Sequence, residues 1–381
     1  MNFSIDAVVL LKVIKSLGVV AKLNVSDYTG LVLIESSNNS VNFVVNNGIV
    51  ALTFLTEKVE IREPGAISIG YGQIKSFVSS YRPWDGSSGA KNFEFISDGR
   101  NLDINVDVFY AQGKPSKGIL KTPTSNPSLV SKPQDFKKES FILNSAIFKE
   151  ATNKVLYAVN PQSDIDHPAL RGMLLKFTKD NIYFAGSNGI VLSEFQMRNN
   201  SNLESENIIL QYDFVAGLKR LLTDGIQMSW ELTANRVAVR FNEITLFGRK
   251  LIGHDYPEYR PIFDNFTNHI NLSKEFLIDS ISPFMDILVA EDNHRLTIEI
   301  KDKVLSIYND QANISSELDG VGGFDFAVDI NGRHLFQTIE AIRDDHILFK
   351  FKDRDKKQKH IILDSSNFND QKSLVSTVVR R

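Results

Sequence analysis

The sequence predicts an α+β fold: three tandem copies of a domain in which two helices lie over a predominantly antiparallel sheet. Three observations predict it. One opening phrase recurs three times along the 381 residues, a second helix-like run follows each copy at a similar offset, and alternating apolar segments fill the rest. The length agrees, because domains of about 100–200 residues would divide this chain into two to four.

Each copy opens with a short alternating strand, a polar capping residue and a run of helical period. The capping residues are Asp6, Asn144 and Ser273, whose side chains accept hydrogen bonds from the first free N–H groups of a helix. We therefore expect a helix to begin directly after each of them. The expected helical runs are AVVLLKVIKSL (7–17), SAIFKEATNKV (145–155) and KEFLIDSISPF (274–284).

The second helix of each copy is expected from apolar residues that recur three and four positions apart. These helices are GYGQIKSFVSSY (70–81), QYDFVAGLKRLLTD (211–224) and NGRHLFQTIEAIRD (331–344). Alternating apolar segments, several with a turn signal near the middle, predict antiparallel hairpins. The hairpin segments are 41–54, 92–109, 174–195, 236–251, 296–309 and 347–364.

A stretch rich in Pro, Ser, Thr and Lys separates the first two copies. Residues 112–137 hold four prolines, which is typical of a linker or an extended excursion. The second boundary, near residue 265, is shorter. The expected division is 1–125 for the first domain, 126–138 for the linker, 139–264 for the second domain and 265–381 for the third.

The composition excludes several kinds of functional site. With no cysteine, the chain holds neither a disulfide nor a Cys-ligated zinc site nor a thiol nucleophile. It contains no Walker phosphate loop and no Gly-x-Ser-x-Gly elbow, and its seven histidines lack a helical metal-binding spacing. We therefore expect a protein that is not an enzyme and that uses no cofactor and no metal.

The N-terminal apolar stretch does not have the pattern of a signal peptide, because Lys12 and Lys15 interrupt it and Asp6 precedes it. No run approaches the roughly 20 apolar residues that a membrane span needs. We expect a cytoplasmic protein without a membrane partner. The net charge of −3 argues against a protein that coats DNA with a basic surface, but it allows basic residues gathered on one inner surface.

Three local phrases resemble the DNA polymerase III beta clamp of bacteria. ALRGMLLKF (169–177) and FAGSNGIVLSEF (184–195) are similar to that family's second domain, where a Gly-x-Leu-Leu strand precedes a strand ending in a Thr/Ser-Asp/Asn-Gly turn. FGRKLIGHDYPEYRPIF (247–263) is similar to the phrase that closes the second domain, and INGRHLFQTIEAI (330–342) to a third-domain helix. The order of modules covers the chain, and the likeness in individual residues lies mainly between residues 165 and 345.

The resemblance implies a DNA sliding clamp, a processivity factor whose subunits join head to tail into a homodimeric ring with the helices lining the pore. It implies duplex DNA of any sequence, a DNA polymerase, a clamp loader and a second copy of the chain as partners. Cations on the pore helices would offset phosphate charge without reading bases. The expected DNA-binding residues are Lys12, Lys15, Lys22, Lys75, Lys149, Lys154, Lys219, Arg220 and Arg333; a solvated helix surface is the alternative for each.

The resemblance also implies a groove between the second and third domains that receives short apolar peptides from the polymerase and the loader. Plain core packing is the alternative for each apolar member. The expected lining is Leu170, Ser187, Gly189, Val191, Leu192, Pro257 and Ile262, with His334 at the rim and Val375, Thr377, Val378 and Val379 at the chain end.

The ring interface implied by the family pairs an edge strand of the first domain with a helix end of the third. By position, Leu102 and Ile104 would face Ile287 and Leu288 of a second copy, and burial inside each domain is the alternative.

Two departures indicate a divergent member of the family, of the kind that a phage encodes. Tyr71-Gly72 and Gln211-Tyr212 stand where the family often has adjacent basic residues. The chain ends in SLVSTVVRR in place of a Met- and Pro-containing phrase, so we expect an altered peptide preference.

Two other classes of protein are alternatives to a clamp. A hydrolase with carboxylates spread along the chain would need a pair that the sequence does not single out. A structural or interaction protein of repeated β-rich domains would be nearly all β, whereas every copy here carries two amphipathic helices.

Overall fold

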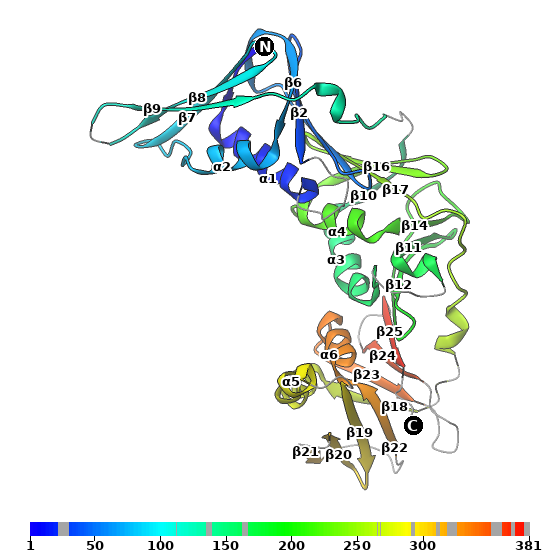
Figure 1. Ribbon diagram of the computed structural model, residues 1–381. Coiled ribbons are helices and arrows are strands. Elements are labelled where there is room, and N and C mark those ends of the chain that lie inside the picture. The colour runs from blue at the N-terminus through cyan, green and yellow to red at the C-terminus, as the bar shows by residue number, and fades with distance from the viewer. Residues whose placement is uncertain are drawn as a thin grey trace. The chain divides into compact units, whose positions relative to one another are not determined.

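The structure of the chain is a computed structural model, shown in Figure 1. It describes residues 1–21, 30–111, 113–134, 139–161, 167–264, 266, 268–290, 294–309, 313–317, 326–351, 360–366 and 370–376. The chain divides into two compact units. Unit 1 comprises Met1–Ala146 and Asp213–Lys250, and unit 2 comprises Ile147–Tyr212 and Leu251–Arg381.

All six predicted helices are confirmed, and each begins within one residue of its predicted start. The first of the three copies contains α1 (Ala7–Ala21) and α2 (Tyr71–Ser79), the second contains α3 (Ser145–Val155) and α4 (Tyr212–Leu221), and the third contains α5 (Lys274–Ala290) and α6 (Gly332–Ala341). α5 is longer than predicted and continues past Pro283, which lies inside it.

The three predicted capping residues each cap a helix. The Asp6 carboxylate accepts from the backbone N–H of Val8 at 2.8 Å, and the Asn144 side chain accepts from Ala146 at 2.8 Å. The Ser273 hydroxyl accepts from Phe276 at 3.3 Å. Each bond satisfies an N–H group that has no partner within its helix, so the repeated phrase has the same physical function in all three copies.

Unit 1 holds two antiparallel sheets with α1 between them, and Figure 1 shows α1 and α2 side by side beneath them. Sheet A has the order β5-β1-β7-β8-β9 and sheet B the order β10-β15-β16-β17-β4-β3-β2-β6. The strands of sheet A are β1 (Asn2–Asp6), β5 (Val59–Glu63), β7 (Gly89–Ser97), β8 (Asn101–Phe109) and β9 (Ser116–Pro123). Those of sheet B are β2 (Leu31–Ser36), β3 (Val41–Asn46), β4 (Ala51–Thr56), β6 (Gly65–Gly70), β10 (Glu139–Asn144), β15 (Gln227–Leu232), β16 (Arg236–Phe241) and β17 (Ile244–Arg249).

Unit 2 repeats this plan with α5 and α6 packed together. Sheet C has the order β14-β11-β12-β13-β25-β24-β23-β18 and sheet D the order β21-β20-β19-β22. The strands of sheet C are β11 (Gly172–Phe177), β12 (Asn181–Ser187), β13 (Val191–Arg198), β14 (Asn207–Gln211), β18 (Asn268–Ser273), β23 (His346–Phe351), β24 (His360–Ser365) and β25 (Gln371–Ser376). Those of sheet D are β19 (Arg295–Lys301), β20 (Val304–Tyr308), β21 (Asn313–Glu317) and β22 (Phe326–Asn331).

Sheets B and C each run across a boundary between predicted domains. β17 of the second copy pairs with β4 of the first, with Leu246 opposite Leu52. β13 of the second copy pairs with β25 of the third, with Leu192 opposite Leu374. Each compact unit therefore contains parts of two copies. The expected division into domains describes the repeat in the sequence, and it stays a prediction about independent folding.

The Pro-rich stretch between the first two copies contains more structure than a linker. Residues 116–123 form the strand β9, and Pro127–Leu129 form a short 3-10 helix. Val130 is buried against Leu33 and Val44 of sheet B. The stretch therefore extends sheet A and then crosses the face of sheet B.

Candidate functional site

The helices of unit 1 carry five of the expected DNA-binding residues. The buried stripe of α1 includes Leu10, Val13 and Leu17, so Lys12 and Lys15 lie on its other side. Lys15 is exposed, and Arg220 at the end of α4 is exposed as well, while Lys75 on α2 and Lys219 on α4 are half-buried.

Lys12 is partly neutralised. Its Nζ lies 2.8 Å from Oε2 of Glu243, in the turn between β16 and β17, and 5.6 Å from the centre of the Phe54 ring. Glu243 responds to the contact, because the hydrogen bond from Lys12 lowers the pKa of its carboxyl. Lys12, Lys15 and Arg220 are therefore the exposed cations of the expected set in unit 1, and Lys12 is the one whose partner carboxylate lies in the described part of the chain.

Lys154 in unit 2 is a correction to the expected set. Its side chain is only 4% exposed, and its Nζ lies 3.1 Å from Glu150 and 2.9 Å from Asp370. It also lies 4.5 Å from the centre of the Phe195 ring. A lysine held by two carboxylates beneath the surface cannot approach a phosphate, so Lys154 is a packing residue of α3.

The remaining expected cations have mixed positions. Arg333, at the start of α6, is exposed and Lys149 on α3 is half-buried. Lys22 lies outside the described residues.

The predicted groove is built around the turn that leads into β13. The Ser187 hydroxyl donates to the backbone oxygen of Val191 at 2.8 Å and accepts from Gly189 N–H at 3.1 Å. Gly189 has a φ of 84°, a left-handed conformation that glycine adopts without strain. The turn leaves Ile190 45% exposed, and the backbone oxygen of this residue accepts from Ser376 N–H at 2.8 Å.

The structure divides the predicted groove residues between the two faces of sheet C. Successive residues of a strand point to opposite faces. Leu192 packs with Leu374, Ile362 and Tyr259, whereas Val191 and Val375 pack in the cluster that includes residues of α5 and α6. Val191 and Val375 are 1% and 0% exposed, so they are core residues and not part of a groove lining.

Three other predicted lining residues lie next in sequence to members of the Leu192 cluster. Leu170 directly follows Ala169 and Pro257 directly follows Tyr256, and both preceding residues belong to the cluster. Ile262 precedes Phe263, which also packs there, and is itself 40% exposed. The apolar surface around this cluster therefore has Ile190 and Ile262 as exposed members.

The segment that carries Pro257 and Ile262 is anchored to β13 by a buried carboxylate. Glu194 is 5% exposed and accepts a hydrogen bond from the hydroxyl of Tyr259. The Arg260 guanidinium donates to both oxygens of Glu194 at 3.2 Å and stacks 3.7 Å from the centre of the Tyr183 ring. A bidentate contact of this kind fixes direction as well as distance, so the segment has a defined position on sheet C. No local sequence pattern marks Glu194, because its partners lie more than 60 positions away.

His334 lies at the start of α6, where its N–H donates to the Asn331 side chain at 3.0 Å. Burial lowers the pKa of its imidazole, and the charges of Arg333 and His294 act in the same direction. Its neighbour on α6, Leu335, belongs to the cluster of Val191 and Val375 and not to the Leu192 cluster. Thr377, Val378 and Val379 lie outside the described residues.

The predicted ring-interface residues of the first copy are a second correction. Leu102 and Ile104 are both 0% exposed, and β8 is paired on both sides, with β7 and β9. A residue buried in the middle of a sheet cannot contact another chain. Ile287 and Leu288 lie in α5, but their side chains lie outside those that the structure describes.

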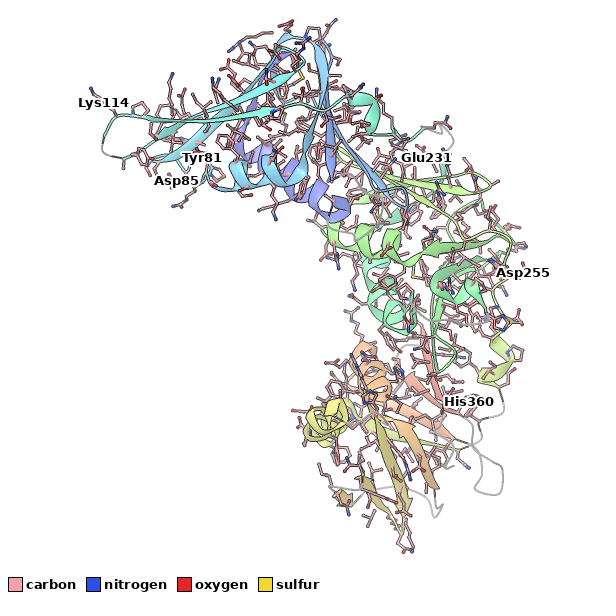
Figure 2. All side chains as sticks on the ribbon, viewed as in Figure 1. Tyr81, Asp85, Lys114, Glu231, Asp255 and His360 are labelled. Atoms are coloured by element: carbon pink, nitrogen blue, oxygen red, sulfur yellow. The ribbon has the colours of Figure 1, made fainter. Side chains whose placement is uncertain are left out.

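One edge of sheet A is β9, which lies in the Pro-rich stretch expected to be a linker or an extended excursion. Ile119 on this strand lies opposite Asn105 of β8 and is 54% exposed. Figure 2 shows Lys114 at the tip of the hairpin that joins β8 to β9. The sequence feature that could have predicted this strand is the apolar pair Ile119-Leu120 between polar residues. It is a weak indication of a strand in a stretch that contains four prolines.

The described residues offer little for chemistry of other kinds. They contain no group of three or more His, Cys, Asp or Glu side chains that could hold a metal ion. In the same part of the chain, no helix has the length and apolar character that crossing a bilayer requires.

The arrangement of the described elements is that of known ring-clamp subunits. No protein-family model and no curated protein matches the chain. Solved structures match over 100% of both chains: the beta subunit of DNA polymerase from Streptococcus pyogenes (TM-score 0.83, 16% identity), the DNA polymerase III subunit beta from Pseudomonas aeruginosa (0.86, 15%) and the DNA polymerase sliding clamp from Bacillus subtilis (0.83, 14%). The chain therefore has the fold of the DNA polymerase III beta sliding clamps, in agreement with the resemblance of its sequence.

Proposed function

We propose that this protein is a DNA sliding clamp, a non-enzymatic subunit that closes a ring around duplex DNA and tethers a replicative polymerase to it. The observation that carries the proposal is the likeness of the whole chain, at TM-scores of 0.83 to 0.86, to beta clamps from several bacteria. The repeated capped helices support it, because they are present in all three copies of the sequence and in the structure.

A protein that forms a ring needs only weak contact with DNA to stay on it. A closed ring stays on DNA by topology, so its inner cations need only offset phosphate charge, and they allow sliding because they read no bases. Lys12, Lys15, Arg220 and Arg333 are the exposed members of the expected set and would supply this charge, although Glu243 partly neutralises Lys12. The overall charge of −3 means that the surface as a whole does not attract DNA, so the proposed binding depends on cations gathered on these helices.

Closure of the ring would use the free edges of the end sheets. β9 is an edge of sheet A, and β21 and β22 are the edges of sheet D. A head-to-tail contact between an edge of sheet A in one copy and an edge of sheet D in another is heterologous, and two such contacts would close a dimer. The exposed Ile119 would add apolar contact to the backbone hydrogen bonds.

The tether would be a short apolar peptide that binds the surface around Leu192. Ile190 and Ile262 offer exposed apolar area, while Glu194 holds one side of the surface in place through Tyr259 and Arg260. Peptide binding on a prearranged surface loses less entropy than binding on a flexible one. Peptides from the polymerase and from the clamp loader would compete for the same surface.

The first experiment measures solution mass by light scattering across a concentration series. We expect a stable dimer of twice 42.9 kDa. The dimer is then loaded onto nicked plasmid by a bacterial clamp loader with ATP, and the complex is isolated by gel filtration. Cutting the plasmid should release the protein, because a ring slides off a free end. A strict monomer at micromolar concentration, or retention that linearisation does not change, would contradict the proposal and favour a repeated-domain interaction protein.

The second experiment measures binding of a fluorescent peptide taken from the C-terminal tail of a bacterial polymerase. Ile262→Asp should weaken this binding about tenfold, because a buried charge without a partner opposes the apolar contact. Ile142→Asp is the matched control, since Ile142 is 58% exposed on β10 of unit 1. Equal loss in both variants would mean that the surface around Leu192 is not the binding site.

A further inference from the structure

A pocket lies in unit 1, on sheet B. It encloses about 240 Å³ where β3 and β4 meet β16 and β17. Residues 131–134, at the end of the Pro-rich stretch, form one wall. The Asn46 side chain holds this wall by donating to the backbone oxygen of Ser131 at 2.8 Å.

The pocket opens on the face of sheet B that is turned away from the helices. A Cβ atom on Gly248 would lie 2.3 Å from the Phe214 ring of α4, so the neighbouring residues Phe247 and Arg249 point to the opposite face. Ala51 and Ala238 are the cross-strand partners of Phe247, and these three residues form a small apolar cluster of their own. Because the side chains of the two alanines are small, they leave a hollow beside the Phe247 ring, and this hollow is the pocket.

The lining of this pocket is cationic. Lys132, Arg236 and Arg249 line it, together with neutral residues and with no carboxylate among the described lining residues. Arg236 and Arg249 are both exposed and stand directly opposite each other on β16 and β17. Like charges at directly opposed positions destabilise a sheet. An anion between them would remove that cost.

Arg240 on the same strand as Arg236 has a carboxylate partner. Arg240 lies four residues along β16, and its Nε lies 2.5 Å from Oε1 of Glu231, which is labelled in Figure 2. Within the described part of the chain, neither Arg236 nor Arg249 forms an ion pair, and the Arg236 guanidinium donates its one hydrogen bond to the neutral Gln134 side chain, at 3.4 Å. Lys132 is paired with Glu35 of β2, which is not among the lining residues of the pocket. The two arginines are thus the members of the pocket that can accept an external anion.

We propose that this pocket is a docking site for an acidic segment of a partner protein, distinct from the apolar surface around Leu192 and additional to the proposed clamp function. One Asp or Glu carboxylate of the segment binds between Arg236 and Arg249. A neighbouring apolar side chain packs on Phe247 and Ile49, which also line the pocket. Arginine suits this role because its planar guanidinium binds carboxylates through two parallel hydrogen bonds.

The geometry favours a protein segment over a nucleic acid. Phe247 is 6% exposed and lies in the pocket floor, so an apolar side chain can reach its edge but too little of its ring is open for a base to stack on it. The cations converge on one hollow and do not follow a track that would match successive phosphates. A charged hollow with an apolar floor matches a peptide that carries an acidic residue next to an apolar one.

The test selects octapeptides from a random phage-displayed library on the immobilised full-length protein, with R236E/R249E as the counter-selection target. We expect enrichment of peptides in which Asp or Glu adjoins an apolar residue. The most enriched sequence is then synthesised with a fluorescein label and titrated by fluorescence polarisation. The wild type should bind this peptide at least about tenfold more tightly than R236E/R249E does. Replacing the acidic residue of the peptide by Gln or Asn should weaken binding to the wild type by a similar factor.

Two controls separate the site from general charge effects. K58E/R100E makes the same change in net charge at exposed positions outside the pocket and should leave the affinity unchanged. R236Q/R249Q should lose binding without reversing charge, and circular dichroism verifies its fold. A selection that yields no peptide dependent on the arginines would overturn the proposal. So would tighter arginine-dependent binding of a fluorescein-labelled 16-nucleotide oligo(dT) than of the selected peptide.

Discussion

Lys15 and Lys154 show that the same residue type on two amphipathic helices can have opposite environments. Lys15 is exposed on α1. Lys154 is 4% exposed, between Glu150 one turn earlier on α3 and Asp370 next to β25. The carboxylate of Asp370 is 216 positions away in sequence, so no local pattern distinguishes the two lysines.

Lys154→Met is expected to lower the free energy of unfolding by about 2 kcal/mol, because it leaves two carboxylates without their shared cation. This value is below that of a fully buried ion pair, since both carboxylates are partly exposed. Lys15→Met should change stability by less than about 0.5 kcal/mol. Urea unfolding followed by circular dichroism measures both. Equal, small effects would show that the Lys154 ion pairs contribute nothing measurable.

His334 predicts a specific dependence of stability on pH. Burial lowers the pKa of its imidazole in the folded protein below the value of about 6.5 expected in the unfolded chain. Between these two pKa values the unfolded chain binds the proton and the folded protein does not. The stabilising contribution is therefore complete above about pH 6.5 and is lost as the pH falls through the folded pKa.

His334→Gln should make the loss of stability between pH 7 and pH 5 smaller than in the wild type. Urea midpoints at several pH values measure this difference. His269→Gln, at an exposed position on β18, controls for the removal of a histidine as such. If both variants follow the wild-type curve, burial of His334 does not couple folding to pH.

At the scale of elements, β9 changes the interpretation of the subunit interface. It covers β8, so Leu102 and Ile104 are core residues and the free edge of sheet A moves one strand outward. Exposed edge strands are templates for pairing with another chain. The later part of the Pro-rich stretch also belongs to the fold, since Val130 packs on sheet B.

Ile119→Asp is expected to raise the dimer dissociation constant about tenfold or more, because it places a charge in the proposed contact. Sedimentation equilibrium measures the constant. Ile96→Asp is the control, since Ile96 lies on β7 of the same sheet, away from its edge, and is 39% exposed. Dimerisation that is insensitive to Ile119→Asp would remove β9 from the interface.

At the scale of the whole molecule, the repeats are not independent. β13 of the second copy pairs with β25 of the third, and Leu192 of the second copy packs with Ile362 and Leu374 of the third. Ala158 and Val191 of the second copy likewise belong to the core of the third. The continuous sheets make each copy depend on its neighbour for part of its burial.

A fragment of residues 1–264 should therefore not behave as two folded domains. It lacks β25, so the edge of β13 and the apolar surface around Leu192 are exposed. We expect it to aggregate on gel filtration, whereas the full chain elutes as a defined species. A monodisperse fragment with sharp thermal unfolding would show that the predicted second domain folds without the third.

The sequence by itself determined the elements: six helices, their three capping residues and the hairpins, because capping and periodicity are local properties of the chain. It also indicated the clamp fold through the order of its phrases. Only the tertiary structure decided which apolar and charged residues are available to partners. Val191, Leu192, Leu102 and Lys154 all carry patterns that fit a binding surface, and their burial depends on strands and carboxylates from distant parts of the chain. Whether a side chain is exposed to a partner depends on how distant segments pair and pack, and local sequence patterns do not contain this information.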